Sequence, residues 1–247
     1  DYEAEPWYWV PEVETALRVA RVPTRLKQYY RKENATGCLK VLAEWVLGSL
    51  DTPSVGSTQI TKHLREILGE SAISREVIGA KTTTWLNKVE VGARKMQRET
   101  PLSEDDLVYI QQGPSDPLEL TGALIDRKQP RWLMGWRDIT NATNERTVIG
   151  GIYPKAGSGH NLPVWHPDYE LGTQVIAGLV AELSSLSLDY AARQKVAGTH
   201  LNFFYAGQLP VHNPSQFTRE ELIFLVPRVL ELTYTSHSMR PWAEDLG

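Results

Sequence analysis

Apolar residues at helical spacing dominate the chain from Pro11 to about Gln112. In residues 11–32 they recur at intervals of three and four, and Pro23 is expected to break or kink the helix that they predict. Further helical runs follow at residues 38–50, 57–69, 74–99 and 103–113. The first of these places Leu39, Leu42, Ala43 and Val46 on one face and is expected to end at Gly48. The last opens with Ser103 and Asp106, a cap candidate and an acidic first turn.

A different pattern begins at Arg131. Residues 131–165 are rich in Trp, Val, Ile, Gly and Pro, which favours short strands joined by tight turns. Within them, residues 131–154 have the pattern of two strands connected by an Asn- and Thr-rich turn. Residues 172–198 then return to helical spacing, with one face expected to carry Leu179, Leu183, Leu186 and Tyr190. Residues 199–214 are predicted to be extended, and residues 218–236 form a last helix capped by Thr218.

These patterns predict an α+β fold in two segments. Residues 1–125 form a mainly helical segment, and residues 126–247 form a small mixed α/β domain. The opening residues 1–11, DYEAEPWYWVP, are aromatic and bounded by Pro, which predicts a short extended segment. Because the chain starts without Met and reaches this aromatic patch at once, we expect it to be cut from a larger polypeptide.

Composition places the chain among ordinary globular proteins, because 41% of its residues are hydrophobic and 23% are charged. It has no apolar run of membrane-spanning length and no leader-like start, so a cytoplasmic protein that does not contact a membrane is expected. The single Cys38 excludes an internal disulfide framework and a multi-cysteine zinc site. In its helical context Cys38 is predicted to be a small buried hydrophobic residue.

Charge is unevenly distributed along the chain, although the net charge is only −4. Basic residues are in excess from Arg18 to Lys40 and from Asp126 to Asn161, whereas acidic residues gather in residues 99–107 and 242–247. Local basic surfaces on an acidic protein are compatible with binding a polyanion. They are equally typical of solvated helix faces.

Motifs for catalysis or metal binding are missing from the sequence. The glycine-containing stretch KAGSGHN at residues 155–161 is no phosphate-binding loop of the GxxxxGK[ST] type. The histidines of the C-terminal half show no metal-ligand spacing, and no GxSxG motif is present. The sequence therefore predicts no catalytic, cofactor-binding or metal-binding residues in this chain.

The turn between the two predicted strands has unusual chemistry. Side chains that suit base edges or phosphates crowd into eleven positions: Arg137, Asn141, Thr143, Asn144, Arg146 and Thr147. One interpretation is a DNA-contacting surface. The other is a turn held by Asn and Thr hydrogen bonds, with Arg137 or Arg146 paired to Asp138 or Glu145. The residues alone leave both open.

A family resemblance bears on this choice. The stretches RWLMGWRDITNATNERTVIGGIYPKAGSGHNLPVW and LSLDYAARQKVAGTHLNFFYAGQLPVHNP resemble the carboxy-terminal part of type IIG-like adenine-specific DNA methyltransferases of bacterial restriction and phage-defence systems. The likeness covers roughly residues 126–215 and WYWVP near the start, and the helical segment between them is expected to be an insertion. The resemblance implies a target recognition region. Its catalytic domain, which uses S-adenosylmethionine and an Asn-Pro-Pro-aromatic tetrapeptide, would lie upstream; residues 212–215, HNPS, are not that tetrapeptide.

The resemblance thus implies a DNA-recognition part that grips duplex DNA for an upstream catalytic domain of the same polypeptide. The residues expected to contact DNA are Arg137, Asn141, Asn144, Arg146, Lys155, His160, Lys195 and His200, with Arg146, Lys155 and Lys195 assigned to phosphates. Other proteins of the defence system are further expected partners. A second hypothesis is a helical protein-interaction module that docks a partner in a phage-defence complex. A third, weaker one is a small free-standing hydrolase.

Overall fold

The computed structural model describes residues 10–50, 57–69, 73, 82–96, 101–165 and 171–247. It divides the chain into two compact units. Ala16–Gln129 form the first, here called the helical unit, and Asp1–Thr15 with Pro130–Gly247 form the second, here called the C-terminal unit. The boundary predicted between residues 125 and 126 falls inside a helix. The predicted extended segment at the start of the chain lies mostly outside the described residues.

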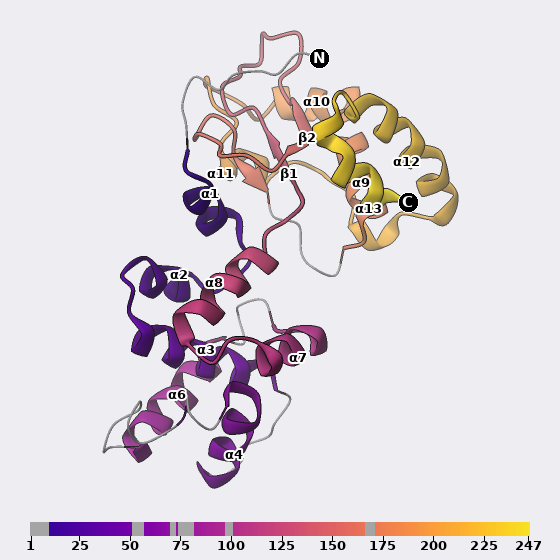
Figure 1. The fold of residues 1–247 in the computed structure, drawn as a ribbon. Helices are drawn as coiled ribbons and strands as arrows, with labels where there is room; N and C mark the ends of the chain where they lie inside the picture. Colours follow the sequence, from indigo (N-terminus) through magenta and orange to yellow (C-terminus); the bar gives the residue numbers. More distant parts are fainter. Residues whose placement is uncertain (1–9, 51–56, 70–72, 74–81, 97–100, 166–170) are drawn as a thin grey trace. The chain divides into compact units, whose positions relative to one another are not determined.

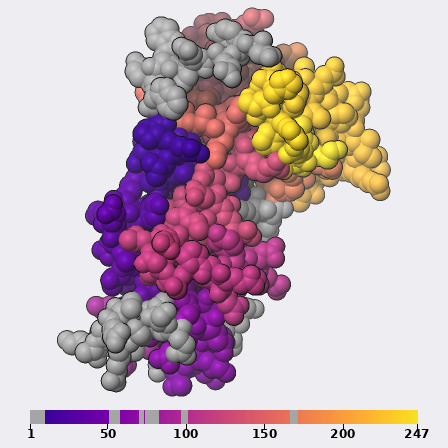
Figure 2. All heavy atoms as spheres, viewed as in Figure 1, coloured from indigo at the N-terminus to yellow at the C-terminus, as the bar shows by residue number. Residues whose placement is uncertain are grey.

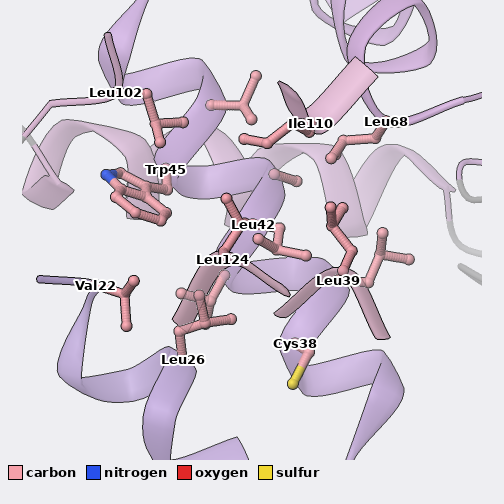
Figure 3. Close-up of a cluster of buried hydrophobic side chains, with 14 of the residues drawn as sticks. Val22, Leu26, Cys38, Leu39, Leu42, Trp45, Leu68, Leu102, Ile110 and Leu124 are labelled. Carbon is pink, nitrogen blue, oxygen red and sulfur yellow. The ribbon is translucent and has the colours of Figure 1, made fainter. Parts of the chain in front are cut away.

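The helical unit is built around one buried helix. Its helices are α1 (Glu12–Val19, which crosses the boundary between the units), α2 (Thr24–Arg31), α3 (Ala35–Ser49), α4 (Ser57–Leu68), α6 (Thr82–Met96), α7 (Glu104–Gln112) and α8 (Pro117–Arg127). The central helix is α3, which packs against α2, α4, α6 and α8. Figure 3 shows the core around it, where Leu39, Leu42 and Trp45 project between the neighbouring helices. Cys38 is fully buried there, as predicted, and burial raises the pKa of its thiol.

Local signals set most of these helix ends. The chain breaks at Pro23 between α1 and α2, as predicted. Gly69, directly after α4, takes the left-handed conformation with φ 89°, which glycine adopts without strain. Ser103 and Asp106 form a reciprocal capping box at the start of α7. The sequence pattern did not predict α8, because its Pro117 and Gly122 are typical of loops. Pro117 is the first residue of the helix, however, where proline is well tolerated. Of the helix predicted at residues 74–99, the structure describes the part that forms α6, and the other residues lie outside the described ranges.

The C-terminal unit contains a three-stranded antiparallel sheet, which confirms the predicted strands. The order is β2 (Gly150–Pro154), β1 (Trp132–Trp136), β3 (Val164–Trp165), with Met134 of the central strand opposite Ile152 and Trp165 (Figure 1). Helix α9 (Thr173–Leu183) packs against β2 and against α12 (Arg219–Thr233). The fold is therefore α+β, mainly helical with a small mixed region.

Two predictions for the C-terminal unit were wrong. Residues 172–198 form two helices, α9 and α10 (Leu186–Arg193), which meet at 58°. The Ser185 side chain accepts a hydrogen bond from the Leu188 amide and so starts a new helix. Leu186 and Tyr190 therefore leave the predicted apolar face and are 75% and 68% exposed.

The other error concerns residues 199–214, which are not all extended. They contain α11 (Phe203–Ala206), capped by the Asn202 side chain, and run into the short 3-10 helix η1 (Pro214–Gln216). Helix α12 has the predicted Thr218 cap. Beyond it the sequence pattern missed η2 (His237–Met239) and α13 (Arg240–Leu246), whose Trp242 is fully buried. Among the described residues, no single helix has the length and apolar character needed to cross a membrane.

Candidate nucleic-acid interface

Three stretches that are separate in the sequence meet just beyond the end of β1. The Arg137 amide donates to the Ile149 carbonyl, and the Asp138 amide donates to the Asn161 carbonyl, both at 2.9 Å. On the third stretch, the Leu201 amide donates to the Asp138 carbonyl at 2.7 Å, and Ile139 forms an isolated bridge with His200. Most of the predicted DNA-contacting residues therefore belong to one region of the C-terminal unit.

From the last residue of β1 onward, buried and exposed side chains alternate. Trp136, Asp138 and Thr140 are buried, whereas Arg137 and Ile139 are exposed. The buried face is fixed by specific bonds, because the Trp136 indole Nε1 donates to the Leu201 carbonyl at 2.6 Å. Arg137 is thus presented outward by backbone geometry.

The turn itself is held by a carboxylate from α10. One oxygen of Asp189, Oδ1, accepts from the amides of Thr147 at 2.7 Å and Val148 at 2.8 Å. The other oxygen, Oδ2, accepts from Arg193 Nε at 2.9 Å. Burial by itself would raise the pKa of Asp189, but these hydrogen bonds and the nearby Arg146 outweigh it and lower the pKa. Asp189 is therefore a buried, fully engaged carboxylate that joins α10 to the turn.

Two arginines complete this connection. Arg193 also donates to the carbonyls of Ala142 and Glu145, on the far side of the turn. Arg146 Nη2 donates to the Ser184 carbonyl at 2.8 Å, and its Nε lies 3.5 Å from Asp189 Oδ1. The interpretation of a hydrogen-bonded turn paired Arg137 or Arg146 with Asp138 or Glu145. In the structure, Arg146 pairs with Asp189 instead.

The asparagines and threonines of the turn bond to one another. Asn141 Oδ1 accepts from the amide and hydroxyl of Thr143, at 2.9 and 2.7 Å. Asn144 Nδ2 donates to Thr140 Oγ1 at 3.3 Å, and that hydroxyl donates to the Thr147 carbonyl at 2.8 Å. The turn is therefore preorganised by its own side chains, while the Asn141 amide nitrogen has no acceptor among the described residues.

The remaining predicted contacts are exposed cations and histidines: Arg137, Lys155, His160, Lys195 and His200. Within the described residues, the side chains of Arg137, His160 and Lys195 make no hydrogen bond or ion pair. His200 differs, because its Nδ1 lies 2.6 Å from Asp138 Oδ2 while the ring is half exposed. The acids Asp138 and Asp189 are thus turned inward, and the outward-facing charges of this region are mainly positive.

Other surface features lie elsewhere. A hollow of about 480 Å³ is lined by His212, Phe217 and Phe224, and one of about 640 Å³ by Lys62, Arg65 and Leu86. The described residues hold no group of three or more His, Cys, Asp or Glu side chains arranged to bind a metal ion.

Sequence reasoning missed the structural roles of Asp189 and Arg193. A signal was present, because the two are four positions apart on a helix, where an acid and a base pair readily. Their other partners in the turn lie 41–51 positions away, and spacing gives no indication of those contacts.

Comparison of the chain with protein-family models, with curated proteins and with solved structures gives no match in any of the three.

Proposed function

We propose that this chain is the DNA-recognition part of a larger adenine-specific DNA methyltransferase or restriction-modification enzyme, and that it grips duplex DNA for a catalytic domain upstream in the same polypeptide. The observation that carries the proposal is the sorting of charge around the turn. Asp138 and Asp189 are buried and paired, whereas Arg137 and Lys195 are exposed without protein partners among the described residues. The resemblance of residues 126–215 to the methyltransferases supports it.

The contacts divide the predicted residues into two roles. Arg137, Lys155 and Lys195 are exposed and suit phosphates, the main source of protein–DNA affinity. Asn141 has an amide nitrogen that can donate to a DNA acceptor while its oxygen holds the turn. Arg146 already donates to protein carbonyls and lies beside Asp189, so we assign it to holding the turn.

Salt-dependent binding of the 247-residue chain to duplex DNA tests this proposal. Without the catalytic domain we expect a Kd of roughly 10⁻⁴ to 10⁻⁶ M, the range of non-specific binding, which weakens steeply as salt rises. Arg137→Ala and Lys195→Ala should each weaken binding to all sequences and lower the salt slope by about one. The matched control is Lys62→Ala, an exposed lysine of the helical unit that pairs with Glu66.

Arg146→Ala separates the two roles of arginine. If Arg146 holds the turn, the variant melts at a lower temperature and retains its residual DNA affinity. If Arg146 contacts phosphate, the melting temperature stays constant and the affinity falls. Absence of salt-sensitive DNA binding by the unmodified chain contradicts the proposal and favours the helical protein-interaction module instead.

A further inference from the structure

A hollow of about 480 Å³ opens between the first turns of α12 and the segment that precedes them, and we call it the α12 hollow. Helix α12 lies at the surface of the C-terminal unit (Figure 1), and its atoms are drawn in gold in Figure 2. The helix contributes Glu220, Glu221, Phe224 and Leu225 to the lining. Each of the two acids lies one helical turn before an apolar residue, so the four side chains share one face.

Helix α9 fixes the two aromatic rings that line the hollow from the preceding segment. The backbone amide of His212 donates to Glu182 Oε1 at 2.9 Å, and its ring Nδ1 lies 2.7 Å from the same oxygen. The Phe217 ring packs against Gly178, where an added Cβ would lie 3.0 Å from the ring. Gly178 and Glu182 are one turn apart on α9, so one face of that helix holds both rings. This wall of the hollow is therefore formed without a ligand, which lowers the cost of binding one.

The polar part of the lining carries negative charge. Glu221 Oε2 accepts from the backbone amide of Thr218 at 2.8 Å and from its hydroxyl at 2.9 Å, and these hydrogen bonds lower the pKa of Glu221. Glu220 is exposed and makes no hydrogen bond or ion pair within the described residues. The described residues that line the hollow include no Lys or Arg, and His212 is paired with Glu182. The hollow therefore combines an apolar interior with carboxylates that attract a cation.

Exposed apolar surface continues from the hollow along α12. Phe224, Arg228 and Leu232 follow one another at intervals of four residues and form one row, in which Phe224 is 56% and Leu232 is 77% exposed. The cation in this row is engaged, because the Arg228 guanidinium lies 3.7 Å from the centroid of the Phe224 ring and donates to the Phe224 carbonyl. Beside Leu232, the exposed Glu231 adds a further carboxylate. The row spans about 12 Å at 1.5 Å per residue, a length that suits the apolar face of a helix rather than a small cation.

We propose that the α12 hollow and the row beyond it are a docking site for a basic amphipathic helix of a partner protein. A large apolar side chain of that helix enters the hollow, and lysine or arginine side chains beside it pair with Glu220 and Glu221. The basic stretch at residues 18–40 of a second copy lacks such a face, because Leu26 and Leu39 are buried within its own unit. The site shares no residue with the predicted DNA contacts and does not depend on the proposed function.

Fluorescence anisotropy with three labelled peptides of about 14 residues, roughly four helical turns, tests the docking site. The first peptide has leucines at helical spacing and lysines elsewhere. The second has glutamate in place of every lysine, and the third has serine in place of every leucine. The unmodified chain should bind the leucine–lysine peptide at least about 10-fold more tightly than either of the others, because only this peptide supplies both apolar contact and positive charge.

Two variants of the hollow should weaken this binding. Phe224→Ala removes the apolar contact and Glu220→Lys reverses the charge, and each should lower the affinity by about fivefold or more. Both side chains are exposed, so the melting temperature should stay close to that of the unmodified chain. The matched control is Glu145→Lys, which changes the net charge equally at an exposed position of the same unit and should leave the affinity unchanged.

Selective loss of binding in Phe224→Ala and Glu220→Lys supports the docking site. Equal binding of the leucine–lysine and serine–lysine peptides, or equal weakening in Glu145→Lys, indicates general attraction to an acidic protein and overturns it. Sedimentation velocity tests the remaining occupant. Self-association of the unmodified chain that Phe224→Ala abolishes assigns the surface to a second copy and overturns the proposal as well. None of these outcomes depends on DNA binding, which is measured separately.

Discussion

Replacing Asp189 with Ala should loosen the turn and destabilise the C-terminal unit. The side chain is 3% exposed and engages four groups from two parts of the chain, residues 146–148 of the turn and Arg193 of α10. Its removal leaves the amides of Thr147 and Val148 buried without an acceptor, since these residues are 0% and 2% exposed. It also leaves the partly buried guanidinium groups of Arg146 and Arg193 without their carboxylate.

The expected cost follows from these contacts. A buried donor left unsatisfied costs about 1–3 kcal/mol, and breaking a buried ion pair by removing one partner costs about 3–5 kcal/mol. The two costs are not additive, because the groups share one carboxylate. We therefore expect a loss of about 3–5 kcal/mol, which lowers the melting temperature by about 6–20 °C at ~2–4 °C per kcal/mol. Asp189→Asn keeps an acceptor for the amides and should fall between Ala and the unmodified protein.

Hydrogen exchange read by mass spectrometry, together with calorimetry, measures both consequences. Exchange should accelerate in peptides that cover residues 140–150, while peptides from α3 in the helical unit keep their protection. The control is Glu145→Ala, which removes an exposed acid from the same turn and should change stability by less than about 0.5 kcal/mol. An Asp189→Ala variant with unchanged melting and unchanged exchange at Thr147 and Val148 would refute the role assigned to this carboxylate.

Three further outcomes are expected. Folding lowers the pKa of Asp189, so the carboxylate stabilises the fold above its unfolded pKa of about 3.9, and this stabilisation is lost as the pH falls through the folded pKa. In acid-unfolding curves, the difference in stability between the unmodified chain and Asp189→Ala should therefore shrink below about pH 4. Gly92→Ala should lower the melting temperature of the helical unit by the equivalent of about 1–3 kcal/mol, because a Cβ there would lie 2.2 Å from Cδ of the buried Glu44; Gly198→Ala, with nothing within 4 Å, is its control. Titration calorimetry with S-adenosylmethionine should give no binding heat, since we place its site in the upstream domain, and a saturable signal would show that this assignment is wrong.

Short-range features of the fold could be predicted from the sequence. Pro23 predicted the break between α1 and α2, and Thr218 predicted the start of α12, because both act on backbone within a few residues. The bend between α9 and α10 was missed, since Ser184 and Ser185 fit within a helix and only the cap that Ser185 makes ends it. The buried Trp242 of α13 was missed because a seven-residue helix has too few turns to show a period.

The candidate site was predicted only in part. The pattern of strands and turn residues placed Arg137, Asn141 and Arg146 in one connection between β1 and β2. It could not tell that Arg146 is directed to Asp189, or that His200 meets Asp138, 62 positions away in the chain. Periodicity describes which face of an element a side chain occupies, and it contains no information about the distant element that covers that face.

The sequence by itself thus determined the helix periods, the turn chemistry and the supply of charged side chains, all of which depend on neighbouring residues. The tertiary structure alone decided which of those charges remain at the surface. A buried carboxylate such as Asp189 is stable only when donors surround it, and its donors come from α10 and from the turn that begins at Arg137. In the folded protein, Arg146 and Arg193 therefore pair with Asp189, because both lie within reach of its carboxylate. Arg137 and Lys195 do not reach it and remain exposed.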